Sequence, residues 1–326
     1  MPLRTPLCER LGIQVPIIQA PIGSAATPDL AAAVCDAGGL GMLALTWADR
    51  NAAREQIRQV RRRTSRPFGV NLVLDFPVRE LLEVCLDEGV EIISTFWGDP
   101  ASVTDRVRRA GALHLHSVGS VQEARQAVQA GVDCVVAQGW EAGGHVRGRT
   151  TTMTLVPAVV DAVGPVPVVA AGGIGDGRGL AAALLLGAQA GWLGTRFLTA
   201  AEAGTHPVYR HAVRTAGDAD TVYTSCFDGG WPNAPHRVIR NSTVAAWEAA
   251  GMPAAPARPG EGEIVAADER GTTRLRYSDS VPVAGMTGDL EAMALYAGQT
   301  AALVHDEKPA RQIVKTIAAQ ADRLLS

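Results

Sequence analysis

The chain has 326 residues, about twice the size of a common domain, so it forms two domains or one large domain with an insertion. Hydrophobic residues make up 47% and charged residues 19%, a balance that can bury a sizeable core and argues against disorder. Lys and Arg number 30 against 33 Asp and Glu, so the net charge of −3 provides no basic surface for nucleic acid or an anionic membrane.

The longest uncharged stretches, 11–28 and 179–195, contain Gln together with Pro or Gly. Neither predicts a membrane span, which needs about 20 predominantly apolar residues. The first residues lack the apolar region of a secretory signal. Five scattered cysteines without a CxxC pair predict neither a disulfide framework nor a zinc site. We therefore expect a cytoplasmic protein that binds no metal, nucleic acid or membrane.

Short apolar runs alternate with helical patterns up to residue 198. The runs that predict strands are 16–20, 39–45, 68–74, 91–97, 113–118, 134–138, 166–171 and 191–198. Stretches between them, such as 29–37, 52–63, 121–130 and 179–187, carry apolar residues at helical spacing. Continuous apolar runs fit parallel strands that are covered on both faces. The pattern predicts an α/β fold, a (β/α)₈ TIM barrel, with a doubly wound open sheet as the alternative.

This rhythm breaks after residue 198. Residues 206–283 are rich in Pro, Gly, Asp and Thr, and 263–267 and 273–277 are typical of small strands. Helical patterns return at 289–304 and 310–325. Removing the 78 residues of the excursion leaves 248, close to the roughly 250 of a typical barrel. We expect a barrel formed by 1–205 and 284–326, with a lid or cap inserted at 206–283.

Two glycine-bearing loops follow the seventh and eighth predicted strands, where barrels of this kind commonly bind a phosphate. The loops read Ala-Ala-Gly-Gly-Ile-Gly-Asp-Gly at 170–177 and Gly-Thr-Arg at 194–196. Glycines expose backbone N–H groups, and the helix that follows the first loop favours an anion at its N-terminus. A single glycine cluster forms a tight turn as often as a phosphate site, but two clusters at the expected places favour a phosphate site.

The segment Gln-Gly-Trp-Glu-Ala-Gly-Gly-His at 138–145 follows the sixth predicted strand. Gln138 at the strand end points to the barrel mouth, where its amide can bind a planar heterocycle. Gly143 and Gly144 let the backbone pass close to a flat ligand and place His145 over it. An isolated histidine more often braces a loop, but this position favours a base, acid or hydrogen-bond donor. His114 and His116 fit interior roles better, and His206, His211 and His236 fit surface or packing roles.

These motifs together resemble the nitronate monooxygenases, FMN-dependent (β/α)₈-barrel enzymes. The similar segments are Pro-Ile-Ile-Gln-Ala-Pro at 16–21, Gly-Gly-Leu-Gly at 38–41, Phe-Gly-Val-Asn-Leu at 68–72, 138–145, 170–174, 194–197 and Ala-Gly-Gln at 297–299. The resemblance implies His145 as the catalytic residue and FMN as the cofactor. It implies that FMN is held by Ala20, Pro21, Asn71, Gln138, Gly143, Gly172, Gly173, Gly194 and Thr195.

The resemblance further implies oxidation of an alkyl nitronate with O₂ to a carbonyl compound and nitrite. His145 would take a proton from a neutral nitroalkane or hydrogen-bond a nitronate, and no metal is needed. The alternative is an NAD(P)H-dependent FMN reductase of enoyl thioesters or quinones, because related enzymes share the 141–145 loop and scaffold. A phosphate-binding isomerase or synthase and a nucleotide-binding sensor are further alternatives. The insertion at 206–283 is where specificity would be set.

Overall fold

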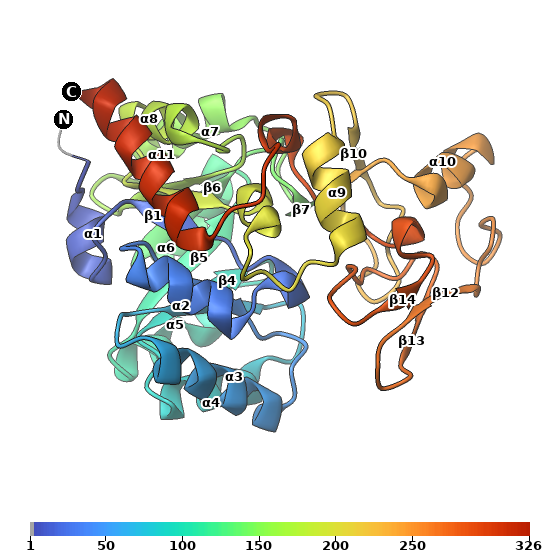
Figure 1. Ribbon diagram of the computed structural model, residues 1–326. Coiled ribbons are helices and arrows are strands. Elements are labelled where there is room, and N and C mark those ends of the chain that lie inside the picture. The colour runs from blue at the N-terminus through green and yellow to red at the C-terminus, as the bar shows by residue number, and fades with distance from the viewer. Residues whose placement is uncertain (1–2) are drawn as a thin grey trace.

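The computed structural model describes residues 3–326 and forms a barrel of parallel strands surrounded by helices (Figure 1). The eight-stranded sheet has the order β1-β9-β8-β6-β5-β4-β3-β2. A parallel bridge joins Ile18 to Leu40, and Leu40 N–H donates to Ile17 O at 2.9 Å. This contact joins β1 and the chain just before β2, the two ends of the sheet order, and so closes the barrel. The predicted TIM barrel is therefore confirmed, and the open sheet is not formed.

The barrel strands lie where the apolar runs predict them. They are β1 (Ile17–Gln19), β2 (Met42–Ala44), β3 (Gly69–Val73), β4 (Ile92–Phe96), β5 (Leu113–Val118), β6 (Cys134–Gln138), β8 (Val168–Ala171) and β9 (Ala190–Leu193). All residues of β3 and of β8 are buried, as expected for strands with side chains in both the lumen and the helix layer. The eighth predicted strand ends at Leu193, because residues 195–199 turn into the 3₁₀ helix η2 (Thr195–Thr199).

The helices that cover the barrel begin at good capping residues. Thr27, Asp49, Ser120 and Asp176 each accept backbone hydrogen bonds from the first turn of the helix that follows. The helices are α2 (Pro28–Asp36), α3 (Arg50–Arg63), α4 (Arg79–Asp87), α5 (Ala101–Arg109), α6 (Val121–Gln129), α7 (Thr152–Val163), α8 (Gly177–Leu185) and α11 (Ala310–Leu325). A further helix that the sequence pattern did not predict, α1 (Pro6–Leu11), places Leu7 and Leu11 in the cluster that fills the barrel lumen.

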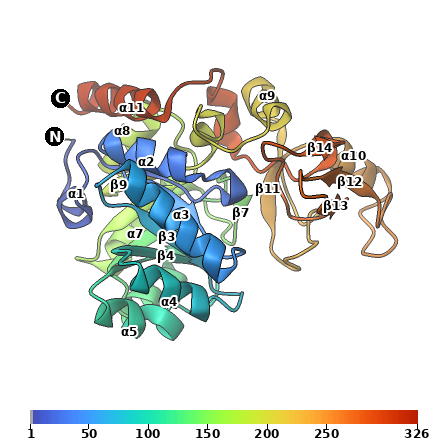
Figure 2. The same ribbon diagram turned by 60° about the horizontal axis from the view of Figure 1, so that its bottom comes forward.

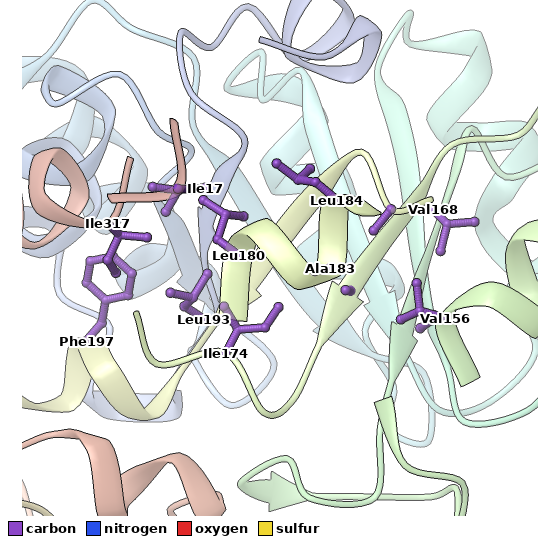
Figure 3. Close-up of a cluster of buried hydrophobic side chains, with 14 of the residues drawn as sticks. Ile17, Val156, Val168, Ile174, Leu180, Ala183, Leu184, Leu193, Phe197 and Ile317 are labelled. Carbon is purple, nitrogen blue, oxygen red and sulfur yellow. The ribbon is translucent and has the colours of Figure 1, made fainter. Parts of the chain in front are cut away.

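The largest hydrophobic cluster lies between the strands and the helix layer (Figure 3). It joins Ile17, Val168 and Leu193 of the strands to Leu180 of α8 and Ile317 of α11. These side chains are at most 3% exposed. This packing fixes the strand ends, and therefore the loops that follow them, on a rigid frame.

The excursion after η2 forms two small antiparallel sheets and two helices that lie to one side of the barrel (Figures 1 and 2). Its elements are α9 (Pro207–Thr215), β10 (Thr221–Thr224), β11 (His236–Ile239), α10 (Ser242–Ala249), β12 (Ile264–Ala267) and β13 (Thr273–Leu275). The strand β14 (Thr287–Gly288), which pairs with β12, lies just beyond residue 283. One sheet has the order β10-β11-β7, where β7 (Gly144–His145) belongs to the loop after β6. The other sheet has the order β13-β12-β14 and includes both of the small strands predicted from the sequence.

The predicted helix at 289–304 is wrong. The chain instead forms two 3₁₀ turns, η3 (Leu290–Ala292) and η4 (Gln299–Leu303), with an extended segment between them. Ile239 N–H donates to Leu295 O at 2.8 Å, and Val238 forms an antiparallel bridge with Tyr296. Pairing with β11 therefore overrides the helical spacing of the apolar residues, and it carries Tyr296 toward the barrel mouth.

Candidate active site

A cavity of about 500 Å³ lies at the carboxyl ends of the barrel strands. Every residue that the resemblance assigned to catalysis or FMN lines it: Ala20, Pro21, Asn71, Gln138, Gly143, His145, Gly172, Gly173, Gly194 and Thr195. Residues of the excursion, among them Trp231, Asp279 and Val281, complete the lining. The excursion therefore lies over the carboxyl ends of the strands and not over the opposite end of the barrel.

The two predicted phosphate loops face each other across neighbouring strands, since β8 pairs with β9. Gly172 and Gly173 have φ angles of 94° and 72°, which glycine adopts without strain. Within residues 3–326, the backbone N–H groups of Gly173, Ile174, Gly194 and Thr195 make no hydrogen bond. Free N–H groups around a cavity suit the oxygens of an anion.

The N-terminus of α8 does not contribute to this cradle as the sequence pattern suggested. Asp176 caps the helix by accepting from Arg178 N–H at 2.9 Å and from Gly179 N–H at 3.3 Å. Gly177 N–H donates to the side chain of Gln320 at 3.0 Å. Because these donors are occupied, the available anion donors come from the loops themselves, up to Ile174.

The loop from Gln138 to His145 is folded tightly by its glycines. A side chain on Gly143 would place its Cβ 2.3 Å from the backbone nitrogen of Gly298, so only glycine fits there. The Gln138 side-chain NH₂ donates to His145 O at 3.1 Å, while its Oε1 is buried with no hydrogen-bond partner among residues 3–326. Gln138 thus braces the loop with one end of its amide and keeps the other end for a ligand.

His145 lies among aromatic rings in the inner part of the cavity. Its ring centroid is 4.2 Å from that of Trp231, 5.3 Å from that of Tyr296 and 5.4 Å from that of His236. Its Nε2 is buried and has no hydrogen-bond partner in residues 3–326. Burial, with a smaller contribution from His236, lowers the pKa of His145 well below 6.5. The imidazole is therefore neutral near pH 7 and can accept a proton or hydrogen bond.

Tyr296 provides a second unpaired polar group in the same cavity. Its hydroxyl is buried without a partner in the described chain, and burial raises its pKa well above 10, so it stays protonated. Asp279, from the excursion, also lines the cavity, and burial raises its pKa to about 6. A neutral acceptor, a hydroxyl donor and a weakly acidic carboxyl therefore share one cavity.

His236 has a bracing role, in line with the packing role expected from the sequence. Its Nε2 accepts from Phe227 N–H at 3.2 Å, so Nδ1 carries the proton that it donates to Ala234 O at 3.0 Å. Burial lowers its pKa to about 4, which keeps the ring neutral. No sequence pattern indicated that this ring would lie beside His145.

His114 and His116 do not line the main cavity. Thr95 Oγ1 lies 2.7 Å from one ring and 2.8 Å from the other. Thr104 of α5 bonds the remaining nitrogen of His114 at 3.0 Å. These contacts fix both rings in the layer outside the strands, which agrees with the interior roles expected from the sequence.

Among the cavity side chains that sequence reasoning did not name as site residues are these four: Trp47, Trp231, Asp279 and Tyr296. Three of them come from irregular segments, where periodicity carries no information about position. Tyr296 had one signal, since it directly precedes the Ala-Gly-Gln segment at 297–299 that belongs to the resemblance.

Two further findings concern residues 3–326. They contain no group of three or more His, Cys, Asp or Glu side chains placed to hold a metal ion. No helix among them has the length and apolar character needed to cross a membrane.

Known proteins are similar to this chain in sequence and in fold over most of its length. The profile of the family described as "Nitronate monooxygenase" matches residues 4–81 and 77–320. The nitronate monooxygenase of Pseudomonas aeruginosa is 35% identical, over 94% of this chain and 96% of that protein. A Mycobacterium tuberculosis protein named (3aS,4S,5R,7aS)-5-hydroxy-7a-methyl-1-oxo-octahydro-1H-indene-4-carboxyl-CoA dehydrogenase is 38% identical, over 75% of this chain and 68% of its own length. The solved structure of FabK from Thermotoga maritima superposes with a TM-score of 0.82 at 32% identity, covering 99% of this chain and 98% of that one.

Proposed function

Because the chain belongs to the nitronate monooxygenase family of flavin oxidoreductases, we propose that it binds FMN and oxidises alkyl nitronates with O₂ to a carbonyl compound and nitrite. The observation that carries this proposal is a pair of buried atoms in one cavity, His145 Nε2 and Tyr296 Oη, that have no hydrogen-bond partner in the described part of the chain. Buried polar groups are nearly always hydrogen-bonded, so an unpaired acceptor beside an unpaired donor indicates a ligand that bonds to both.

The residues of the cavity fit FMN. The free N–H groups of Gly173, Ile174, Gly194 and Thr195 would hold the phosphate, and the unpaired Oε1 of Gln138 would accept from the ring system. The volume of about 500 Å³ lies in the range of roughly 300–1,000 Å³ that is usual for cofactor sites. When bound, FMN supplies the transfer of electrons from the substrate to O₂.

The side chains of the protein accept the substrate's proton and stabilise the negative charge that forms as it leaves. With a neutral nitroalkane, Nε2 of His145 takes the proton of the carbon next to the nitro group. The hydroxyl of Tyr296 donates a hydrogen bond to a nitro oxygen, where negative charge accumulates as that proton leaves. A nitronate arrives without this proton, so it needs the hydrogen bond but not the base.

The second candidate function is FMN-dependent redox chemistry on a thioester, either as a dehydrogenase or as an NAD(P)H-dependent reductase of enoyl thioesters or quinones. The 38% identical relative named as a CoA-ester dehydrogenase favours it. Proton removal beside a thioester carbonyl needs the same pair of groups, a neutral base and a hydroxyl donor. His145 and Tyr296 alone therefore do not separate a nitronate from a thioester.

Purified protein tests both candidates. The released flavin is identified after denaturation, and O₂ consumption and nitrite are measured with ethylnitronate. NAD(P)H oxidation is then measured with crotonyl-CoA and with 1,4-benzoquinone. We expect FMN, O₂ uptake with ethylnitronate and stoichiometric nitrite. A colourless protein that takes up no FMN on reconstitution would contradict the cofactor proposal, and NAD(P)H-dependent turnover without nitrite formation would favour the second candidate.

A further inference from the structure

Aromatic side chains line the cavity at the ends of β2 and β4, apart from the phosphate loops after β8 and β9. In the closed barrel order, β3 stands across from β8 and β4 stands across from β9. Phe96 ends β4, Trp47 follows β2, which is next to β3 and across from β6, and Trp231 reaches over from the excursion. All three line the cavity. We call these three residues the aromatic wall. If a ligand phosphate binds after β8 and β9, the aromatic wall contacts a different part of the bound cofactor or substrate.

Trp231 is fixed in place at the centre of the wall. Its indole N–H donates to Asp75 Oδ2 at 3.2 Å, and the residue is only 5% exposed. Its ring lies 4.2 Å from that of His145, with the two planes 36° apart. The wall therefore begins directly beside the proposed base.

Trp47 extends the wall toward the surface. Its ring centroid is 6.4 Å from that of Trp231 and 5.4 Å from that of Phe76, which supports it edge-on. Although Trp47 lines the cavity, 56% of the residue is exposed. A tryptophan left open beside a cavity is a surface that a bound apolar group can cover.

From this arrangement we propose that the physiological substrate carries a ring-bearing substituent, aromatic or similarly flat, on its reacting carbon. This inference rests on the proposed nitronate oxidation. A substrate whose carbon faces His145 directs its substituent along Trp231 toward Trp47. Ring-to-ring contact with two indoles favours a flat apolar group over a short alkyl chain.

The first test compares phenylmethylnitronate with ethylnitronate by kcat/KM. We expect the wild-type protein to favour the ring-bearing substrate. The ratio of the two values should fall about tenfold in Trp47→Ala, the scale of one lost aromatic contact. It should recover in Trp47→Phe, which keeps a ring. Leu185→Ala is the matched control, since Leu185 is 69% exposed on α8 and does not line the cavity. An equal ratio in all four proteins would overturn the inference.

The second test does not depend on turnover. Benzoate and acetate, planar anions that resemble nitronates in shape and charge, are titrated into the FMN-loaded protein and followed by the flavin absorbance. We expect benzoate to bind more tightly than acetate, and Trp47→Ala to remove about tenfold of that advantage. If nitronates are not oxidised but this preference is present, the proposed function fails and the wall still selects rings. If nitronates are oxidised and neither test shows a preference, the proposed function stands and the inference fails.

Discussion

Replacing His145 by Asn tests whether this residue removes a proton. The substitution keeps a polar group in the cavity but deletes the base, because an amide does not accept a proton near pH 7. Removing a positioned base typically costs about 10²–10⁴-fold in rate, or roughly 3–5 kcal/mol of barrier. We expect this loss for nitroethane. Ethylnitronate has already lost that proton, so its turnover should fall by less than about tenfold.

The environment of His145 also sets the expected pH dependence. Burial lowers the pKa of its ring well below 6.5, so the ring is unprotonated at pH 7 and above. Lowering the pH protonates and inactivates the base only below that shifted pKa. The rate with nitroethane in the wild-type protein should therefore show no decline between pH 8 and pH 6.5 that is assignable to this histidine.

The assay is the initial rate of O₂ consumption with nitroethane and with ethylnitronate prepared in advance, and flavin content is measured by absorbance. His211→Asn is the control, since His211 is an exposed residue of α9 that does not line the cavity. Equal losses on both substrates in His145→Asn would mean that the ring orients the substrate and does not abstract a proton. Unchanged rates on both would remove His145 from the mechanism.

Three further substitutions address other parts of the site. Tyr296→Phe should keep the flavin and lower kcat/KM for nitronate and nitroalkane alike by about 10–100-fold, since a hydrogen bond to a charged group contributes roughly 1.5–3 kcal/mol; full activity would show that the hydroxyl does not touch the substrate. Burial raises the pKa of the Asp279 carboxyl from 3.8 to about 6, so the folded protein holds this proton more tightly than the unfolded chain. The resulting stabilisation of the folded state is complete below pH 4 and is lost as the pH rises to 6. Thermal unfolding should show Asp279→Asn matching the wild type near pH 4 and exceeding it by about 2–3 kcal/mol at pH 7, whereas parallel pH profiles would contradict this. Gly173→Leu, at a φ of 72°, should abolish FMN binding measured by equilibrium dialysis, and a normal dissociation constant would exclude the loop as the phosphate site.

The barrel could be predicted from the sequence because its strands are buried on both faces. Runs such as 68–74 and 166–171 have no polar alternation, and a strand covered by lumen and helices is the structure that accommodates them. Apart from Asn71, which lies within β3, the residues that the resemblance assigned to FMN lie at or next to the ends of these strands or in glycine-rich loops. Their collection around one cavity therefore follows once the barrel closes.

The substrate side of the cavity could not be predicted in the same way. Trp231 and Asp279 lie in irregular segments whose path depends on tertiary contacts, such as the bond from Trp231 to Asp75. The segment around Tyr296 has apolar residues at helical spacing, and that local preference is overridden by pairing with β11. Patterns that report burial thus predict the positions of the residues proposed to hold FMN, whereas the other side chains of the cavity depend on long-range pairing.

The pairing of β7 with β11 connects the excursion to His145, the proposed catalytic residue. His145 and Gly144 form β7, and they lie in register with His236 and Arg237 of β11. Val146 N–H adds a further backbone bond to Pro235 O at 2.9 Å. The main chain on both sides of His145 is therefore held by the excursion, which also supplies Trp231 to contact its ring at a tilt of 36°. A cap that opened as a rigid unit would have to break this strand pairing and move the base away from the barrel. Changes of sequence within 206–283 should thus alter the position of the base together with the shape of the substrate pocket, so transplanting this segment between relatives will transfer specificity only if the pairing with β7 is preserved.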